Sequence, residues 1–173
     1  PYQLAFYYRS LLLEGQKFSI TEYEKEINKI QLKHLKKFAK KIFKHIYIEG
    51  VAYGNIRPSA VKESIEIFRK NLNAKNLTKE EISINTIRQI LPGNTHIFSR
   101  KLRNKNSALI TEYQIGQRSP ELLAQLMLIE NLIKPDFYNE LRTKQQLGYV
   151  VDSSISVIGK TLGLILLIQS GEY

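Results

Sequence analysis

The residues best suited to chemistry lie in one fifteen-residue stretch, FYNELRTKQQLGYVV, which runs from Phe137 to Val151. Arg142 falls where the apolar spacing is helical, Tyr149 begins a strand-like alternation, and Gly148 lies between them. A guanidinium carries several hydrogen-bond donors and a phenol carries one neutral donor. At such a junction the two side chains are well suited to gripping a peptide backbone.

The same stretch resembles the Leu-Arg-Thr-Lys-x-Gln-Leu-Gly-Tyr segment of the insulysin and pitrilysin family, whose members are zinc metallopeptidases that cut peptides inside a closed chamber. Similarity to the third and fourth repeated units of these enzymes continues along the chain in order. It includes AFYY at positions 5–8, HIYIE at 45–49 with Gly54 to Ile56, and ILLIQS at 165–170.

The resemblance implies an α+β fold built from parts of two successive metallopeptidase-type units, each a mainly antiparallel sheet covered by helices. Residues 1–83 are expected to be the later half of the third unit, and residues 84–173 the first half of the fourth. Because the chain contains only half of each unit, neither sheet is expected to be complete. Because unpaired strand edges favour association with other chains, the fragment is expected to be prone to self-association.

The resemblance also implies roles for two residues. In that family the zinc site lies in the first unit, while the Arg and Tyr of the fourth unit reach across the chamber toward the scissile bond. By this resemblance Tyr149 is catalytic and stabilises the oxyanion, and Arg142 positions the substrate. The implied cofactor is zinc, held by the N-terminal half of the full-length enzyme and not by this chain. The implied partners are a peptide substrate and that N-terminal catalytic half.

Other interpretations remain open from the residues alone. Arg142 could be a solvated residue favoured by the helix dipole, and Tyr149 could be half-buried packing. At the level of the whole protein, the alternative is a non-catalytic structural or partner module of the same fold, since some relatives have lost their metal site. The compartment stays open between periplasm and cytoplasm.

Composition narrows the chemistry that this chain can perform alone. It has no cysteine, which excludes disulfides and thiolate ligands, and its histidines are His34, His45 and His96. Neither His-x-x-x-His nor His-x-x-Glu-His is present, so the zinc motif of these peptidases is missing and the fragment is expected to be inactive alone. The longest apolar run, Leu162 to Ile168, is far shorter than the roughly 20 residues of a membrane helix. The chain is therefore expected not to span a bilayer.

The chain is strongly basic, with 26 Lys and Arg against 16 Asp and Glu and a formal charge of +10. Six of the lysines recur at helical spacing opposite an apolar stripe. They are Lys33, Lys36, Lys37, Lys40, Lys41 and Lys44. Such a stripe could contact nucleic acid or acidic lipid. Phe38 belongs to the apolar stripe on the other side. No aromatic stacking residue interleaves with the lysines, as binders of single strands require, so a solvated face is preferred and nucleic acid is not expected as a partner.

Hydrophobic periodicity and capping signals predict the elements. Helices are expected over residues 2–13, after a capping box at Ser19, along the lysine stripe, and after Pro58, where Val61, Ile65, Phe68 and Leu72 form a buried stripe. A strand is expected within 46–53 and a connection over 71–83. Residues 87–91, 96–101 and 109–115 predict a meander. A helix capped by Ser119 is expected to be interrupted at Pro135, before a second helix with Arg142. Strands are then expected over 149–158 and 163–170, joined by a hairpin turn near Gly159 and Lys160.

Overall fold

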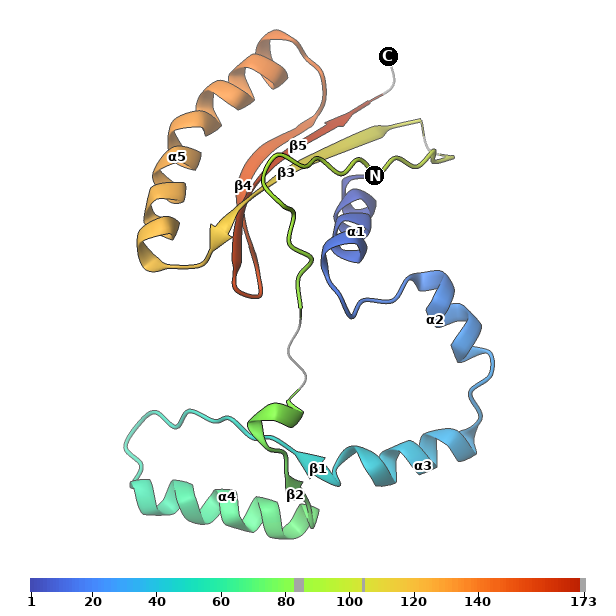
Figure 1. The fold of residues 1–173 in the computed structure, drawn as a ribbon, viewed down its shortest axis with the longest axis vertical. Coiled ribbons are helices and arrows are strands. Elements are labelled where there is room, and N and C mark those ends of the chain that lie inside the picture. Colours follow the sequence, from blue (N-terminus) through green and yellow to red (C-terminus); the bar gives the residue numbers. More distant parts are fainter. Residues whose placement is uncertain (83–85, 104, 172–173) are drawn as a thin grey trace. The chain divides into compact units, whose positions relative to one another are not determined.

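The protein is seen in a computed structural model that describes residues 1–82, 86–103 and 105–171 (Figure 1). It has helices and sheets, which confirms the predicted α+β class. The chain divides into two compact units. The first combines residues 1–18 with 85–173, and the second contains residues 19–84. The predicted boundary at residues 83 and 84 lies outside the described residues.

A three-stranded antiparallel sheet forms the centre of the first unit, in the order β3-β5-β4. Its strands are β3 (Ser107–Gln117), β4 (Val150–Ile158) and β5 (Thr161–Ser170). A tight turn at Gly159, where φ is +56°, joins β4 to β5. Because β5 is the central strand and is covered on both faces, it can be apolar at almost every position, as its sequence TLGLILLIQS is.

Helices lie on both faces of this sheet (Figure 1). Helix α5 (Pro120–Tyr138) packs Leu126 against Leu162 and Leu164 of β5. Side chains alternate between the faces of a strand, so Ile165 points away from α5. Glu112 is the register partner of Ile165 and meets helix α1 (Tyr2–Leu13) on this opposite face.

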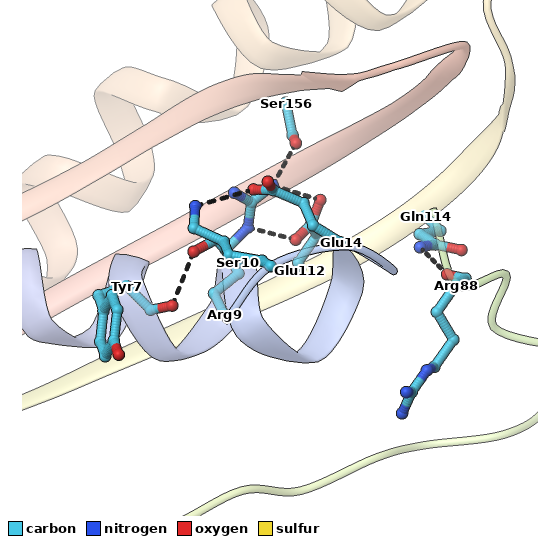
Figure 2. Close-up of polar contacts among 9 residues, drawn as sticks. Tyr7, Arg9, Ser10, Glu14, Arg88, Glu112, Gln114 and Ser156 are labelled. Carbon is cyan, nitrogen blue, oxygen red and sulfur yellow. Dashed lines mark hydrogen bonds and ion pairs between the residues drawn. The ribbon is translucent and has the colours of Figure 1, made fainter. Parts of the chain in front are cut away.

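The contact between α1 and the sheet includes a buried ion pair (Figure 2). Arg9 of α1 donates through Nε to Glu112 Oε2 and through Nη2 to Glu112 Oε1, the latter at 2.8 Å. Arg9 Nη2 also donates to Ser156 Oγ of β4. The side chains of Arg9 and Glu112 are only 14% and 9% exposed. The pair therefore joins the helix to both edge strands of the sheet.

The second unit consists mainly of short helices. They are α2 (Ile20–Ile27), α3 (Leu32–Ile42), α4 (Pro58–Leu72) and the 3-10 turn η1 (Lys79–Glu81). Strands β1 (His45–Ile46) and β2 (Lys75–Asn76) pair in parallel. The first five lysines of the predicted stripe lie on α3, and Lys44 follows the end of the helix. The stripe of α4 was expected to be buried, but Ile65 and Phe68 are exposed.

Elements with strong local signals form as predicted. The helix over 2–13 is confirmed, and so is the capping box, in which the Ser19 amide donates to Glu22 Oε2 at 2.7 Å. Ser119 Oγ accepts from the Leu122 amide and caps α5. The C-terminal hairpin is confirmed as β4 and β5. Among the residues the structure describes, no helix is long and apolar enough to cross a bilayer.

The predicted meander is wrong, because only its last segment becomes a strand, β3. Near residue 87 the chain pairs instead with the end of α1, where the Arg88 amide donates to Leu13 O at 2.7 Å and Ile87 forms an isolated bridge with Glu14. Residues 96–101 form no strand. In that segment Phe98 packs on the ring of Tyr8, and the Arg100 guanidinium lies 5.2 Å from the centre of the same ring.

Two further local predictions fail. Residues 51–53 form no strand, and Val51 and Tyr53 are fully open to solvent. The helix expected to break at Pro135 continues to Tyr138. A proline within a helix removes one amide donor and crowds the carbonyl four residues earlier, but it does not have to end the helix when flanking turns are held by packing. Ile133, beside the proline, packs against the core.

Replacing Glu112 with Gln is expected to lower the free energy of unfolding by about 3 to 5 kcal/mol, because Arg9 then stays buried without its counter-charge. Urea unfolding followed by circular dichroism measures the change. Glu66→Gln is the matched control, since the Glu66 side chain in its pair with Arg69 is 68% exposed. That variant is expected to lose less than about 1 kcal/mol. Equal losses in the two variants would contradict the importance of the buried pair.

Candidate functional site

The site lies where helix α5 passes into strand β4. After Tyr138 the helix widens into the π-helical segment η2 (Asn139–Lys144), and the Gln145 amide donates to Glu140 O at 3.0 Å. The Gln145 side chain also donates to the Glu140 carboxylate, and together with Lys144 it lowers the pKa of that carboxyl. The left-handed residue of the following turn is Gln146, whose φ is +53°. These contacts fix the path of the chain toward Gly148.

Arg142 contacts its own chain at the end of this turn. Its Nη1 atom donates to the carbonyl oxygen of Gly148 at 2.9 Å. A guanidinium has five N–H donors in a planar fork, and this contact uses one of them. Within the described ranges, no acidic side chain forms an ion pair with Arg142. The side chain is half-buried, so one end of the fork is anchored and further donors remain for another molecule.

Gly148 is required by a close approach of two backbones. A Cβ atom at this position would lie 2.1 Å from the carbonyl oxygen of Gln169 and 2.7 Å from its carbonyl carbon. The sequence predicts that Gly148 permits a turn closed to bulkier residues. The structure gives a different reason, since the left-handed conformation belongs to Gln146 and Gly148 is needed to let β4 reach β5.

Tyr149 is held at two atoms by the same residue of β5. Its amide donates to the Gln169 carbonyl at 3.1 Å, and its phenol oxygen accepts a hydrogen bond from Gln169 Nε2. The residue as a whole remains 53% exposed. The phenol oxygen is therefore anchored by a buried residue, while much of the Tyr149 surface stays exposed.

Gln169 is the residue of this site that sequence reasoning missed. It is 1% exposed, and its Oε1 accepts from the Tyr2 amide at 2.7 Å. The available signal was a glutamine within a strand that is otherwise apolar. Buried polar side chains are nearly always hydrogen-bonded, so a glutamine at such a position indicates specific partners.

The structure thus brings Arg142 and Tyr149 to one peptide unit. The carbonyl of that unit, from Gly148, accepts from Arg142, and its amide, from Tyr149, donates to Gln169. Arg142 and Gln169 thus fix the plane of this peptide from its two ends. The arrangement can present hydrogen-bond donors, charged and neutral, from one fixed point at the start of β4.

The described residues do not fit a zinc site. In the part of the chain that the structure describes, no three side chains of His, Cys, Asp or Glu gather closely enough to hold a metal ion. His34 and His45 lie in the second unit and His96 lies in the first. The chemistry of the site described above is therefore that of hydrogen-bond donors.

The segment that contains this site matches a known protein family. Residues 128–173 match the family model "PQQ synthase PqqF-like, C-terminal lobe domain 4". This range contains Arg142, Tyr149 and Gln169.

Curated relatives match nearly the whole chain. The A-factor-processing enzyme of Saccharomyces cerevisiae is 32% identical over 176 residues, which are 98% of this chain and 17% of the relative. The insulin-degrading enzyme of Drosophila melanogaster is 24% identical over 179 residues, 100% of this chain and 18% of the relative. A putative zinc protease of Schizosaccharomyces pombe, mug138, is 27% identical over 92% of this chain and 17% of its own length. The chain thus spans less than one fifth of these relatives.

A solved structure shares the fold. The crystal structure of pitrilysin superposes with a TM-score of 0.70 at 24% identity, over 92% of this chain and 17% of that chain. The similarity in fold therefore covers nearly all of this chain but a small part of the larger protein.

Replacing Gly148 with Ala is expected to lower the free energy of unfolding by about 1 to 3 kcal/mol, because the added methyl group forces β4 away from β5. Faster hydrogen exchange at the Tyr149 amide should accompany the loss. Gly50→Ala is the matched control, since a Cβ there meets nothing within 4 Å. If Gly148→Ala unfolds like Gly50→Ala and keeps the Tyr149 amide protected, the close approach does not constrain the site.

Proposed function

Because the chain belongs to the insulysin and pitrilysin family, we propose that it forms part of the substrate-binding half of a zinc metalloendopeptidase that degrades peptides in a closed chamber. In this proposal residues 1–83 come from the third repeated unit and residues 84–173 from the fourth. The match of residues 128–173 to a fourth domain of a C-terminal lobe supports the second assignment. Zinc is bound by the N-terminal half, so this chain contributes hydrogen-bond donors and is inactive alone.

Tyr149 is the oxyanion donor in this mechanism. Attack on a peptide carbonyl places negative charge on its oxygen, and a donor that is already fixed at that point stabilises the charge without reorganising. Tyr149 meets this need because the residue is 53% exposed and because Gln169 holds both its phenol oxygen and its backbone amide. This anchoring is the observation that carries the proposal.

Arg142 positions the substrate. Its contact with Gly148 O orients the guanidinium plane, and its remaining N–H groups can donate to carbonyl oxygens of an extended peptide. Part of the side-chain entropy is lost before the substrate arrives, which lowers the cost of binding. The peptide substrate and the N-terminal half are accordingly the partners of this surface.

Tyr149→Phe in the full-length enzyme is expected to lower kcat by about 100-fold to 1,000-fold while KM changes little, because the donor acts mainly in the transition state. Initial rates on an internally quenched peptide measure both constants. Tyr113→Phe is the matched control, since Tyr113 is also 53% exposed and lies on β3 of the same sheet. Unchanged turnover in Tyr149→Phe would rule out the oxyanion role.

Arg142→Ala should mainly weaken binding, by about 10-fold to 100-fold, as expected when a charged hydrogen-bond donor is lost. Fluorescence anisotropy with a labelled peptide that cannot be cleaved measures the dissociation constant. Lys144→Ala is the control, because it removes a nearby positive charge whose side chain is 72% exposed and pairs with Glu140. An affinity for the peptide that Arg142→Ala leaves untouched would show that the assigned role is wrong.

A further inference from the structure

We propose that Gln169 is a positioning residue that fixes the Tyr149 phenol as an acceptor toward the protein and, consequently, as a donor toward the substrate. This inference rests on the function proposed for Tyr149. It concerns a residue buried beneath the site, which reaches the reacting atoms only through the phenol.

The direction of each hydrogen bond follows from the Tyr2 amide. A backbone N–H can only donate, so the side-chain atom of Gln169 that faces it, at 2.7 Å, has to be the oxygen. The atom that faces Tyr149 is therefore Nε2, which can only donate. The phenol oxygen accepts in this contact, and its own proton has to point elsewhere. Gln169 is buried and Tyr149 is 53% exposed, so the proton points away from the Gln169 amide.

Helix α1 locks this orientation. The first amides of a helix lack partners within the helix, and α1 begins after Pro1 without a side-chain cap. Gln169 Oε1, on the face of β5 that α1 covers, accepts from the Tyr2 amide. Turning the Gln169 amide over would set donor against donor at Tyr2 in a position that is 1% exposed. Leaving a buried polar group unpaired is unfavourable, so one orientation is retained.

The same contact improves the donor. When a hydroxyl oxygen accepts one hydrogen bond, the polarisation strengthens the bond that its proton donates. Gln169 also accepts from the Tyr149 amide through its backbone, so it fixes both the start of β4 and the phenol at its tip. A fixed donor of known direction is what oxyanion stabilisation requires.

Gln169→Glu is the sharpest test, because it keeps the shape of the side chain and replaces its hydrogen-bond donor with an acceptor. One carboxylate oxygen still accepts from the Tyr2 amide, while the other can only accept from Tyr149 and so draws the phenol proton inward. In the full-length enzyme, kcat on an internally quenched peptide is expected to fall by about 10-fold to 100-fold with KM within about three-fold. In a Tyr149→Phe background the same change should cause no further loss, because the proton it redirects is absent.

Gln114→Glu is the matched control. Its amide bridges backbone groups in the same way. It accepts from the Ile90 amide at 2.9 Å, and it donates to Arg88 O at 3.0 Å, a contact drawn in Figure 2. Gln114 lies on β3 and does not contact Tyr149, so the kcat of the Gln114→Glu variant should stay unchanged. Gln169→Met provides a second variant that removes the donor without adding charge, and it should lower kcat in the same sense.

A spectroscopic measurement separates failure of this inference from failure of the proposed function. Fluorotyrosine placed at position 149 reports the hydrogen bonding of the phenol by fluorine NMR. Its resonance should move in Gln169→Glu and stay in place in Gln114→Glu, whether or not Tyr149 contributes to turnover. A resonance that does not respond to Gln169→Glu, or a loss of kcat that adds in full to that of Tyr149→Phe, would overturn the positioning role.

Discussion

The close approach of Gly148 to the backbone of Gln169 is the constraint on which the site depends. At 2.1 Å from a carbonyl oxygen there is no room for a Cβ atom. Only because glycine lacks one can β4 begin directly beside β5, with the Tyr149 amide donating to Gln169 O and the Gly148 carbonyl accepting from Arg142. The backbone thus sets the positions of the Arg142 and Tyr149 side chains.

The two faces of the sheet support this arrangement by different means. On the α5 face, Leu126, Leu162 and Leu164 form an apolar cluster, whose favourable free energy depends on buried area and little on direction. On the α1 face, where Ile165 and Leu167 are also buried, polar contacts hold the helix in place. Gln169 holds the start of the helix, and Arg9 holds Glu112 and Ser156. Such contacts are lost if the helix shifts by one residue, so this face defines the register of α1.

The sequence was sufficient where the determinants are local. The caps at Ser19 and Ser119 and the hairpin turn at Gly159 depend on residues a few positions apart, and all three were confirmed. The failure of the predicted meander concerns distant partners. Residues 96–101 alternate like a strand, but Phe98 and Arg100 from this segment pack against the ring of Tyr8.

Gln169 escaped notice for the same reason. The partner that fixes its orientation, Tyr2, is 167 positions away, and no period in the sequence connects them. Arg142 and Tyr149 were selected through a family resemblance, and the residues alone left their roles open. Periodicity predicts that a glutamine lies in a strand, but it does not predict which amide that glutamine will meet.

The geometry also makes Arg142 and Tyr149 a coupled pair. Their anchors are the two ends of a single planar peptide, which cannot rotate one end without the other. A displacement of the Gly148 carbonyl tilts the Tyr149 amide, and with it the phenol that Gln169 holds. Groups that share one support in this way do not contribute independently. The site is better understood as one peptide plane bearing a charged donor and a neutral donor than as two separate residues.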